Sequence, residues 1–241
     1  MKNRNINSYG MECLKEILGD SLILKNKLKY FVYNGEEYQL KVSVTDLNSD
    51  TNQFNQMETI NMAIHILGMG TLDSDIDWML LVDSDVALTP ELVLGLWETA
   101  HVNNLKVLSG VYYTLWVPEA TPIPVPVPAV FSYTEKGSIP MHPLPENQII
   151  QADYIGLGLV LVHRSTIETL KEKFPDGVFF AEYLGPNGEF SSEDYQFCKK
   201  LNEAGIPILV HTGLVAQHMK RIAVDKQYYD FYWSNQEQEK Q

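Results

Sequence analysis

Two aspartates, Asp83 and Asp85, stand directly after a short apolar run, Trp78–Val82. The run has the length of a buried strand, and ligands of open α/β sheets bind beyond the carboxyl ends of such strands. Carboxylates one residue apart at that place are hard oxygen ligands, which suit Mg²⁺ or Mn²⁺ and, through the metal, a phosphate-bearing substrate. The pair Asp73–Asp75 has the same spacing but follows no apolar strand, so position favours a functional role for the later pair.

Further acidic and histidine side chains could add chemistry to such a site. Glu193 and Asp194 open an expected helix, where acidic residues commonly do no more than complement the helix dipole. Near a metal-bound phosphate substrate, a carboxylate there could instead act as a general base. His218 could complete a metal site that a carboxylate begins. On generic grounds His211 has the same claim, and an ordinary polar histidine is the commoner case for each.

A pair of glycines, Gly156 and Gly158, lies within an apolar segment. The chain around them does not contain the dinucleotide-binding G-x-G-x-x-G pattern or a P-loop. Glycines inside a strand indicate either a bulge or the tight packing of a helix. They also fit a close approach of the backbone to a ligand, and the sequence leaves both interpretations open.

Apolar periodicity places these residues on alternating strands and helices, which predicts the α/β class. Helices are expected at Met11–Leu18, at Met57–Leu67, from Thr89 onward, at Ser165–Phe174 and, capped by Ser191 or Ser192, at Asp194–Ala204. Strands are expected at Tyr30–Tyr33, Tyr38–Val44, Trp78–Val82, Lys106–Val111, Ala152–Val162 and Ile206–Val210. The first two strands form a hairpin around Asn34–Gly35, and His211–Gln217 is expected to be a loop. Residues 117–148 are rich in proline, which predicts an extended edge segment or flap and not a central strand.

The composition narrows the class of protein. The chain has 241 residues, 45% of them hydrophobic, which is enough for a sizeable core. Its formal net charge of −13 and the lack of a basic stripe argue against nucleic acid as a partner. Two cysteines make neither a disulfide framework nor a zinc pattern. No apolar run approaches the roughly 20 residues of a membrane span, and the polar N-terminus lacks a signal-peptide core. We therefore expect a cytoplasmic protein, or one peripheral to a membrane.

In their order along the chain, these motifs resemble those of GT-A glycosyltransferases, especially the small family-2-like enzymes of phages and microbes. The segment Trp78–Val86 is similar to the metal-binding D-x-D strand of that family, and Asn61 to the asparagine of its A-R-N segment, although Ile60 replaces the arginine. The resemblance covers residues 39–220 and includes Ser109–Tyr113, the glycine loop Ala152–Leu159, the helix Ser192–Cys198 with Glu203–Gly205, and His218 in the position of a late metal ligand.

For the fold, this resemblance implies a Rossmann-related mixed sheet flanked by helices, with the proline-rich flap, in one GT-A-like catalytic domain over residues 1–225. An aromatic and then polar tail follows over residues 226–241. The family's first strand, which helps to hold the nucleobase, has no clear counterpart before Met11–Leu18. Either the region Tyr30–Tyr33 replaces it or the base pocket is unusual. The identity of the nucleotide therefore stays open.

For the function, the resemblance implies metal-dependent transfer of a sugar, with inversion, from a nucleotide-diphosphate sugar to a hydroxyl of a glycan, lipid or protein acceptor. Asp85 and His218 would bind Mn²⁺ or Mg²⁺, and Asp83 would bind the metal through water or the ribose. Asp194 would take the proton of the acceptor hydroxyl, and Glu193 would orient the acceptor. The residues that the resemblance assigns to donor binding are Asn61, Asp83, Ser84, Gly156 and Gly158.

Two other classes account for part of the pattern. Leu81–Val86 matches the nucleophile strand of HAD-type phosphatases passably, and Glu193–Asp194 could stand for their late acidic pair. That motif usually opens the chain, however, and no convincing lysine motif lies between the two segments. A non-catalytic sugar-nucleotide-binding module is the other alternative, with the aromatic segment Tyr228–Trp233 docking a partner or a second copy of the chain.

Overall fold

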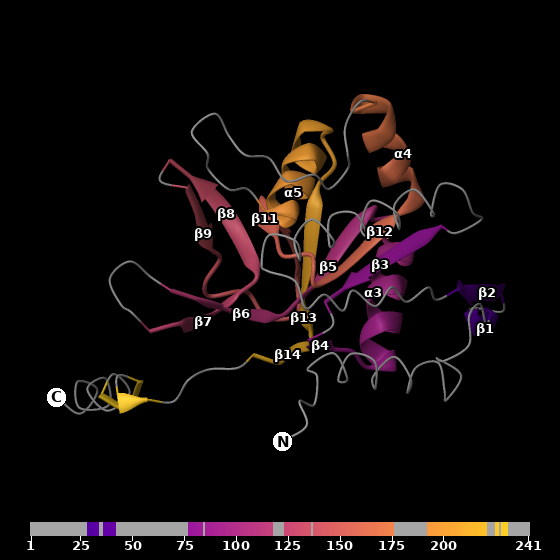
Figure 1. Cartoon of the computed structure of the whole chain (residues 1–241). Helices are drawn as coiled ribbons and strands as arrows, with labels where there is room; N and C mark the ends of the chain where they lie inside the picture. Colours follow the sequence, from indigo (N-terminus) through magenta and orange to yellow (C-terminus); the bar gives the residue numbers. More distant parts are fainter. Residues whose placement is uncertain are drawn as a thin grey trace, which may run out of the picture.

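The computed structural model describes residues 28–33, 36–41, 77–83, 85–117, 123–135, 137–175, 192–220, 225–226 and 228–230. It is a mixed α/β structure built mostly from strands (Figure 1). The expected helices Met11–Leu18 and Met57–Leu67 and the turn Asn34–Gly35 lie outside these residues. The two strands of the expected hairpin are described as β1 (Leu28–Tyr33) and β2 (Glu36–Lys41), and they pair antiparallel.

Five strands form the central sheet, in the order β10 (Ile149–Ala152), β13 (Ile208–Val215), β5 (Val107–Val111), β12 (Leu159–His163) and β3 (Trp78–Val82). Strands β13 and β5 run parallel, whereas β12 is antiparallel to both β5 and β3. Strands β3, β5 and β13 therefore end at one edge of the sheet, and β12 begins there. The strands expected at Trp78–Val82 and Lys106–Val111 are confirmed.

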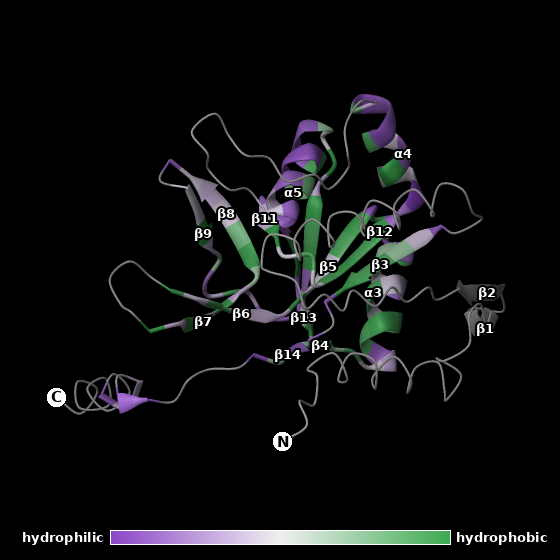
Figure 2. Ribbon diagram, in the orientation of Figure 1, coloured by the Kyte–Doolittle hydropathy of each residue, from purple (hydrophilic) through white to green (hydrophobic). Residues whose placement is uncertain are grey.

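Helices cover both faces of this sheet. Helix α3 (Pro90–Val102) packs on the face that carries Leu108, Leu159 and Leu161. Helices α4 (Arg164–Lys173) and α5 (Glu193–Glu203) pack on the opposite face, which carries Val107, Val160, Val162 and Val210. Neighbouring residues of one strand thus enter different cores, as the period of two requires. Figure 2 shows hydrophobic colour concentrated on these central strands.

The three helices begin where the sequence predicts, because each has a local start signal. Thr89 accepts a hydrogen bond from Leu92 N–H and Pro90 opens the first turn of α3. Ser192 accepts one from Tyr195 N–H at the start of α5. Gly205 follows α5 with a φ of 72°, a left-handed conformation that suits glycine at the end of a helix.

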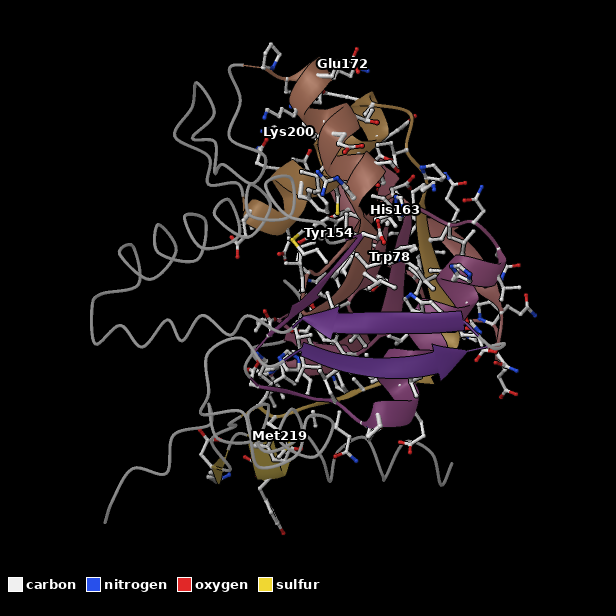
Figure 3. All side chains as sticks on the ribbon, turned by 90° about the vertical axis from the view of Figure 1, so that its right-hand side faces the viewer. Trp78, Tyr154, His163, Glu172, Lys200 and Met219 are labelled. Atoms are coloured by element: carbon white, nitrogen blue, oxygen red, sulfur yellow. The ribbon has the colours of Figure 1, made fainter. Side chains whose placement is uncertain are left out.

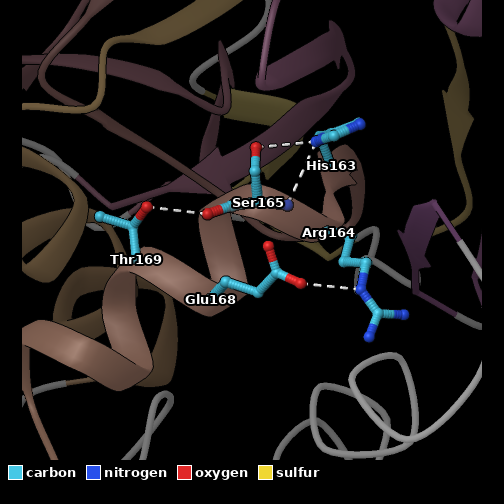
Figure 4. A network of polar contacts seen from close by, with 5 residues as sticks. All are labelled: His163, Arg164, Ser165, Glu168 and Thr169. Carbon is cyan, nitrogen blue, oxygen red and sulfur yellow. Dashed lines mark hydrogen bonds and ion pairs between the residues drawn. The ribbon is translucent and has the colours of Figure 1, made fainter.

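A network of polar contacts begins α4 at the other edge of the sheet (Figure 4). His163 Nδ1 accepts a hydrogen bond from the N–H of Ser165, and Arg164 pairs with Glu168 at 2.8 Å. In Figure 3, His163 and Trp78 lie side by side, and their ring centroids are 4.7 Å apart. Because Trp78 begins β3, this network lies at the end of the strand away from Asp83 and serves the helix start.

The proline-rich stretch forms short strands outside the central sheet. Strand β7 (Val125–Pro128) pairs with β6 (Tyr113–Trp116), and β8 (Val130–Thr134) pairs with β9 (Gly137–Pro140) and β11 (Tyr154–Ile155). Val130 is fully buried and Phe131 is partly buried. This segment is therefore extended and packed on the body of the protein, as expected, and takes no place in the central sheet.

Two expected elements differ from the structure. The single strand Ala152–Val162 is wrong: β11 joins the three-stranded sheet and β12 the central one, with the two glycines in the crossing between them. The expected loop His211–Gln217 is also wrong, because β13 continues to Val215. Thr212 sustains this extension, since its N–H donates to Gln148 O over 2.8 Å and its hydroxyl accepts from Gln148 N–H over 2.9 Å.

Candidate functional site

Three predicted side chains meet where β3 and β13 end. One ligand atom from each of Asp83, Asp85 and His218 lies within 4.8 Å of the other two. Asp83 directly follows β3, and His218 ends β14 (Gln217–His218), just beyond β13. The structure therefore brings together the residues for which the sequence predicts a metal site.

Backbone hydrogen bonds hold these residues in place. Strand β14 pairs antiparallel with β4 (Val86–Ala87), so that His218 lies opposite Val86. The N–H of Met219 donates to Asp85 O over 2.8 Å, and the N–H of Asp83 donates to Gly158 O over 3.1 Å. The ends of β3 and β13 and the start of β12 are thus connected through main-chain contacts.

The imidazole of His218 faces the carboxylate of Asp85 through Nε2. Its Nδ1 lies 2.9 Å from Tyr113 O, which can only accept, so Nδ1 carries the ring proton in the neutral form. The side chain is 4% exposed, and Nε2 has no aligned hydrogen-bond partner among the described residues, although Asp85 Oδ1 is 3.1 Å away. In the neutral ring, the Nε2 lone pair points toward a carboxylate, an arrangement that a cation between the two would stabilise. Metal-binding histidines are typically oriented by such a second-nitrogen hydrogen bond.

The spacing of these atoms also fits a divalent cation. Two ligands that are each about 2.1 Å from an octahedral ion and at right angles to one another lie about 3.0 Å apart. The observed separation of Nε2 and Oδ1 is 3.1 Å. Carboxylate oxygens with one imidazole suit Mn²⁺, and carboxylate oxygens suit Mg²⁺.

The two aspartates differ in their affinity for protons. Partial burial acts to raise the pKa of Asp85, but the contacts and charges of His218 and Lys220 outweigh it and lower this pKa to about 2. Protein atoms closely surround Asp83 although it is accessible to solvent, and this desolvation raises its pKa, with further contributions from Asp85 and Glu193. Asp85 is therefore the more readily ionised of the two candidate ligands.

A buried tyrosine, Tyr112, packs between the glycines and the candidate metal-ligand cluster Asp83, Asp85 and His218. It follows β5 and is 4% exposed. Its ring meets His218 edge-on at 5.0 Å, and its Oη accepts a hydrogen bond from Gly158 N–H over 3.1 Å. In the sequence, Tyr112 stands within the segment Ser109–Tyr113 of the resemblance, which does not indicate these contacts.

The glycines leave room for these neighbours. A Cβ at Gly156 would overlap Tyr112 Oη, and a Cβ at Gly158 would lie 2.7 Å from Asp83 Oδ2 and 2.9 Å from Tyr112 Cζ. Both glycines are thus packed tightly, but against Tyr112 and Asp83 and not against a helix as the sequence suggested. Their assignment to donor binding stays a prediction, and the space beside their α-carbons holds protein side chains.

The acidic pair at the start of α5 faces the same region. Asp194 accepts a hydrogen bond from Leu157 N–H, but burial and the charges of Glu193 and Asp83 raise its pKa well above the ordinary value of 3.8. Leu157 precedes Gly158, whose carbonyl accepts a hydrogen bond from Asp83 N–H, so Asp194 lies beside the turn that holds Asp83. Tyr112 lies close enough to both carboxyl groups for their charges to raise its own pKa.

Other residues that the sequence predicts for the site lie away from this cluster or outside the described part of the chain. His211 accepts a hydrogen bond from Gly213 N–H in β13 and does not join the ligand cluster. Asn61 and Ser84 lie outside the described residues. Lys220 was not predicted from the sequence, and its Nζ is 2.8 Å from Asp85 Oδ2. Only its position two residues after His218 could have indicated it.

The comparisons with known proteins do not assign a family. No protein-family model matches the chain, and no curated protein matches it. Among solved structures, the crystal structure of A197 from STIV is 18% identical, with a TM-score of 0.43, over 67% of this chain and 68% of that one. Among the described residues, no helix combines the length and apolar character that crossing a membrane requires.

Proposed function

We propose that this protein is a metal-dependent glycosyltransferase of the GT-A type, which moves a sugar from a nucleotide-diphosphate sugar to an acceptor hydroxyl. One observation carries the proposal. The cluster Asp83, Asp85 and His218 lies at the same edge of the sheet as a protonatable carboxyl group, that of Asp194. Transfer of a sugar requires both parts, because a diphosphate must leave and an acceptor hydroxyl must lose its proton.

Each residue has a distinct part in this reaction. Asp85 and His218 would hold Mn²⁺ or Mg²⁺ directly, and Asp83 would bind it through water or bind the donor ribose. The bound cation would supply positive charge beside the departing diphosphate. The acceptor oxygen forms a bond to the anomeric carbon as the bond to the diphosphate breaks, and the diphosphate leaves with the electron pair. Asp194 takes the acceptor proton, and attack from the face opposite the leaving group inverts the anomeric centre.

Aromatic side chains beside α5 favour a glycan among the acceptors. Tyr154 contacts Ser192 and is close enough to Asp194 for the charge to raise its pKa. Its ring centroid lies 6.0 Å from that of Tyr195, which in turn lies 5.9 Å from that of Tyr133. Tyr133 and Tyr195 are 39% and 37% exposed. Exposed rings with hydroxyl groups offer a sugar both a flat face and hydrogen bonds.

The decisive experiment screens donors without assuming the nucleotide. The protein is incubated with Mn²⁺ and UDP-, GDP- or dTDP-sugars, and donor binding is measured by thermal shift. CMP-sugars are screened beside them, and because they carry a single phosphate, turnover of these alone would contradict a diphosphate leaving group. Release of the nucleotide product is then measured with and without a panel of glycan acceptors and with EDTA in place of Mn²⁺. The proposal expects one donor class to bind and turn over only with the metal.

Two outcomes would favour the other classes. Release of phosphate from an aryl phosphate ester, without dependence on any sugar nucleotide, would indicate a phosphatase with Asp83 as nucleophile. Binding of a sugar nucleotide without turnover across a broad acceptor panel would indicate a non-catalytic module. The Glu168→Gln variant is a suitable control, because Glu168 lies on α4 in the polar network away from the site.

A further inference from the structure

The ammonium group of Lys220 forms an ion pair with one carboxylate oxygen of Asp85, which we assign as the principal metal ligand. Its Nζ lies 2.8 Å from Asp85 Oδ2, while His218 Nε2 lies 3.1 Å from the other oxygen, Oδ1. Both oxygens of this carboxylate therefore face nitrogen atoms. The charge of Lys220 also reaches Asp83, since it acts to lower the pKa of that carboxyl group.

We propose that Lys220 competes with the divalent cation for Asp85 and thereby makes cation binding depend on an anionic ligand. An ammonium ion and a divalent cation repel each other strongly at such short separation. Close coordination of the cation therefore requires Lys220 to leave the carboxylate. This inference rests on the proposed function, because it assigns Lys220 to the same metal site.

The local structure allows the side chain to move while the backbone stays in place. Met219 N–H donates to Asp85 O, and β14 pairs with β4, so the main chain before Lys220 is held against the site. The side chain itself is 38% exposed and has a long, flexible stem. The ammonium group can therefore exchange partners over a short distance without a change of fold.

A diphosphate is the partner that the displaced ammonium would take. Phosphate oxygens accept strong charge-assisted hydrogen bonds, and lysine binds them as a point charge. A diphosphate bound beside the cation would thus give the ammonium group of Lys220 a new anionic partner in place of Asp85. Because coupling between two ligands is reciprocal, the diphosphate would tighten cation binding by the same factor by which the cation tightens diphosphate binding.

The test measures Mn²⁺ binding by calorimetry, with and without inorganic pyrophosphate, in the wild type and in Lys220→Met. The methionine keeps an unbranched stem of similar reach and removes the charge. For Mn²⁺ alone we expect about five-fold tighter binding in the variant, the scale of a partly exposed ion pair. In Lys220→Met we also expect the factor by which pyrophosphate tightens Mn²⁺ binding to fall at least about five-fold relative to the wild type. Lys220→Arg should keep weak binding of Mn²⁺ alone, and the control Lys226→Met, whose lysine pairs with Asp230, should change nothing.

The outcomes separate this inference from the proposed function. If the wild type binds Mn²⁺ through Asp85 and Lys220→Met has the same affinity and the same pyrophosphate enhancement, the competition is overturned and the metal site stands. If no variant binds Mn²⁺, with or without pyrophosphate, the metal site and the competition are both overturned.

Discussion

The hydroxyl of Tyr112 and the backbone of Gly158 are joined by a hydrogen bond of 3.1 Å, which connects the end of β5 to the start of β12. The same tyrosine ring lies edge-on against the imidazole of His218. One buried side chain therefore supports both the turn beside Asp83 and the histidine of the candidate metal site. This relationship makes the geometry of the site depend on the packing of its neighbours.

The Tyr112→Phe variant should be less stable than the wild type, because it leaves the buried N–H of Gly158 without its acceptor. The expected loss is about 1–3 kcal/mol in the free energy of unfolding, measured by urea denaturation. Tyr113→Phe is the matched control, since the side chain of Tyr113 is 49% exposed. Equal stability of both variants would show that the hydrogen bond makes no net contribution.

The Gly156→Ala variant should also be destabilised, by about 1–3 kcal/mol, because its Cβ would overlap Tyr112 Oη. The cost should shrink in a Tyr112→Phe background, where that oxygen is absent. A double-mutant cycle measured by urea denaturation isolates this coupling. Strict additivity of the two substitutions would contradict the contact between Gly156 and Tyr112.

The parts of this structure that the sequence predicts are those determined by neighbouring residues. Strand β3 is a short apolar run, and α3 and α5 begin with caps that act within one turn, so neighbouring residues determine them. The position of Asp83 and Asp85 at the end of a strand was predictable for the same reason. His218 was predictable only through the resemblance to GT-A enzymes, because nothing around it in the sequence distinguishes it from His211.

The elements that the sequence predicts wrongly are those determined by contacts between residues far apart in the chain. The segment Ala152–Val162 has the composition of one strand, yet its two halves pair with different sheets, a choice made by β8 and by the central strands. The extension of β13 to Val215 depends on Gln148, far away in the chain. The contacts of Tyr112 and Lys220 could not be predicted for the same reason, because they join residues 46 and 135 positions apart.

Substitution of Asp85 tests the metal site most directly. Asp85→Ala should lower Mn²⁺ affinity more than about 100-fold, because removal of even an outer-shell partner typically costs 10–100-fold. Calorimetry of the purified protein measures this loss, and metal-dependent turnover should be abolished. His218→Ala should weaken Mn²⁺ binding in the same direction. Undiminished turnover of Asp85→Ala with added Mn²⁺ would remove Asp85 as a metal ligand.

Asp194 should give the protein a pH dependence that Asp194→Asn lacks. Because burial raises the folded-state pKa of this carboxyl group, its stabilising contribution is complete below its unfolded pKa, near pH 4. That contribution is lost as the pH rises through the folded-state pKa. The free energy of unfolding should therefore fall more steeply with pH above 4 in the wild type than in the variant, as measured by urea denaturation at several pH values.

The catalytic role of Asp194 predicts the opposite trend for activity. A general base acts only when ionised, so transfer should rise with pH as Asp194 loses its proton in the folded protein. Asp194→Asn should bind the donor as the wild type does, by calorimetry with Mn²⁺, and yet lose transfer at every pH. Glu168→Gln should retain both. Full transfer by Asp194→Asn would exclude Asp194 as the base and leave Glu193 as the carboxylate nearest to that role.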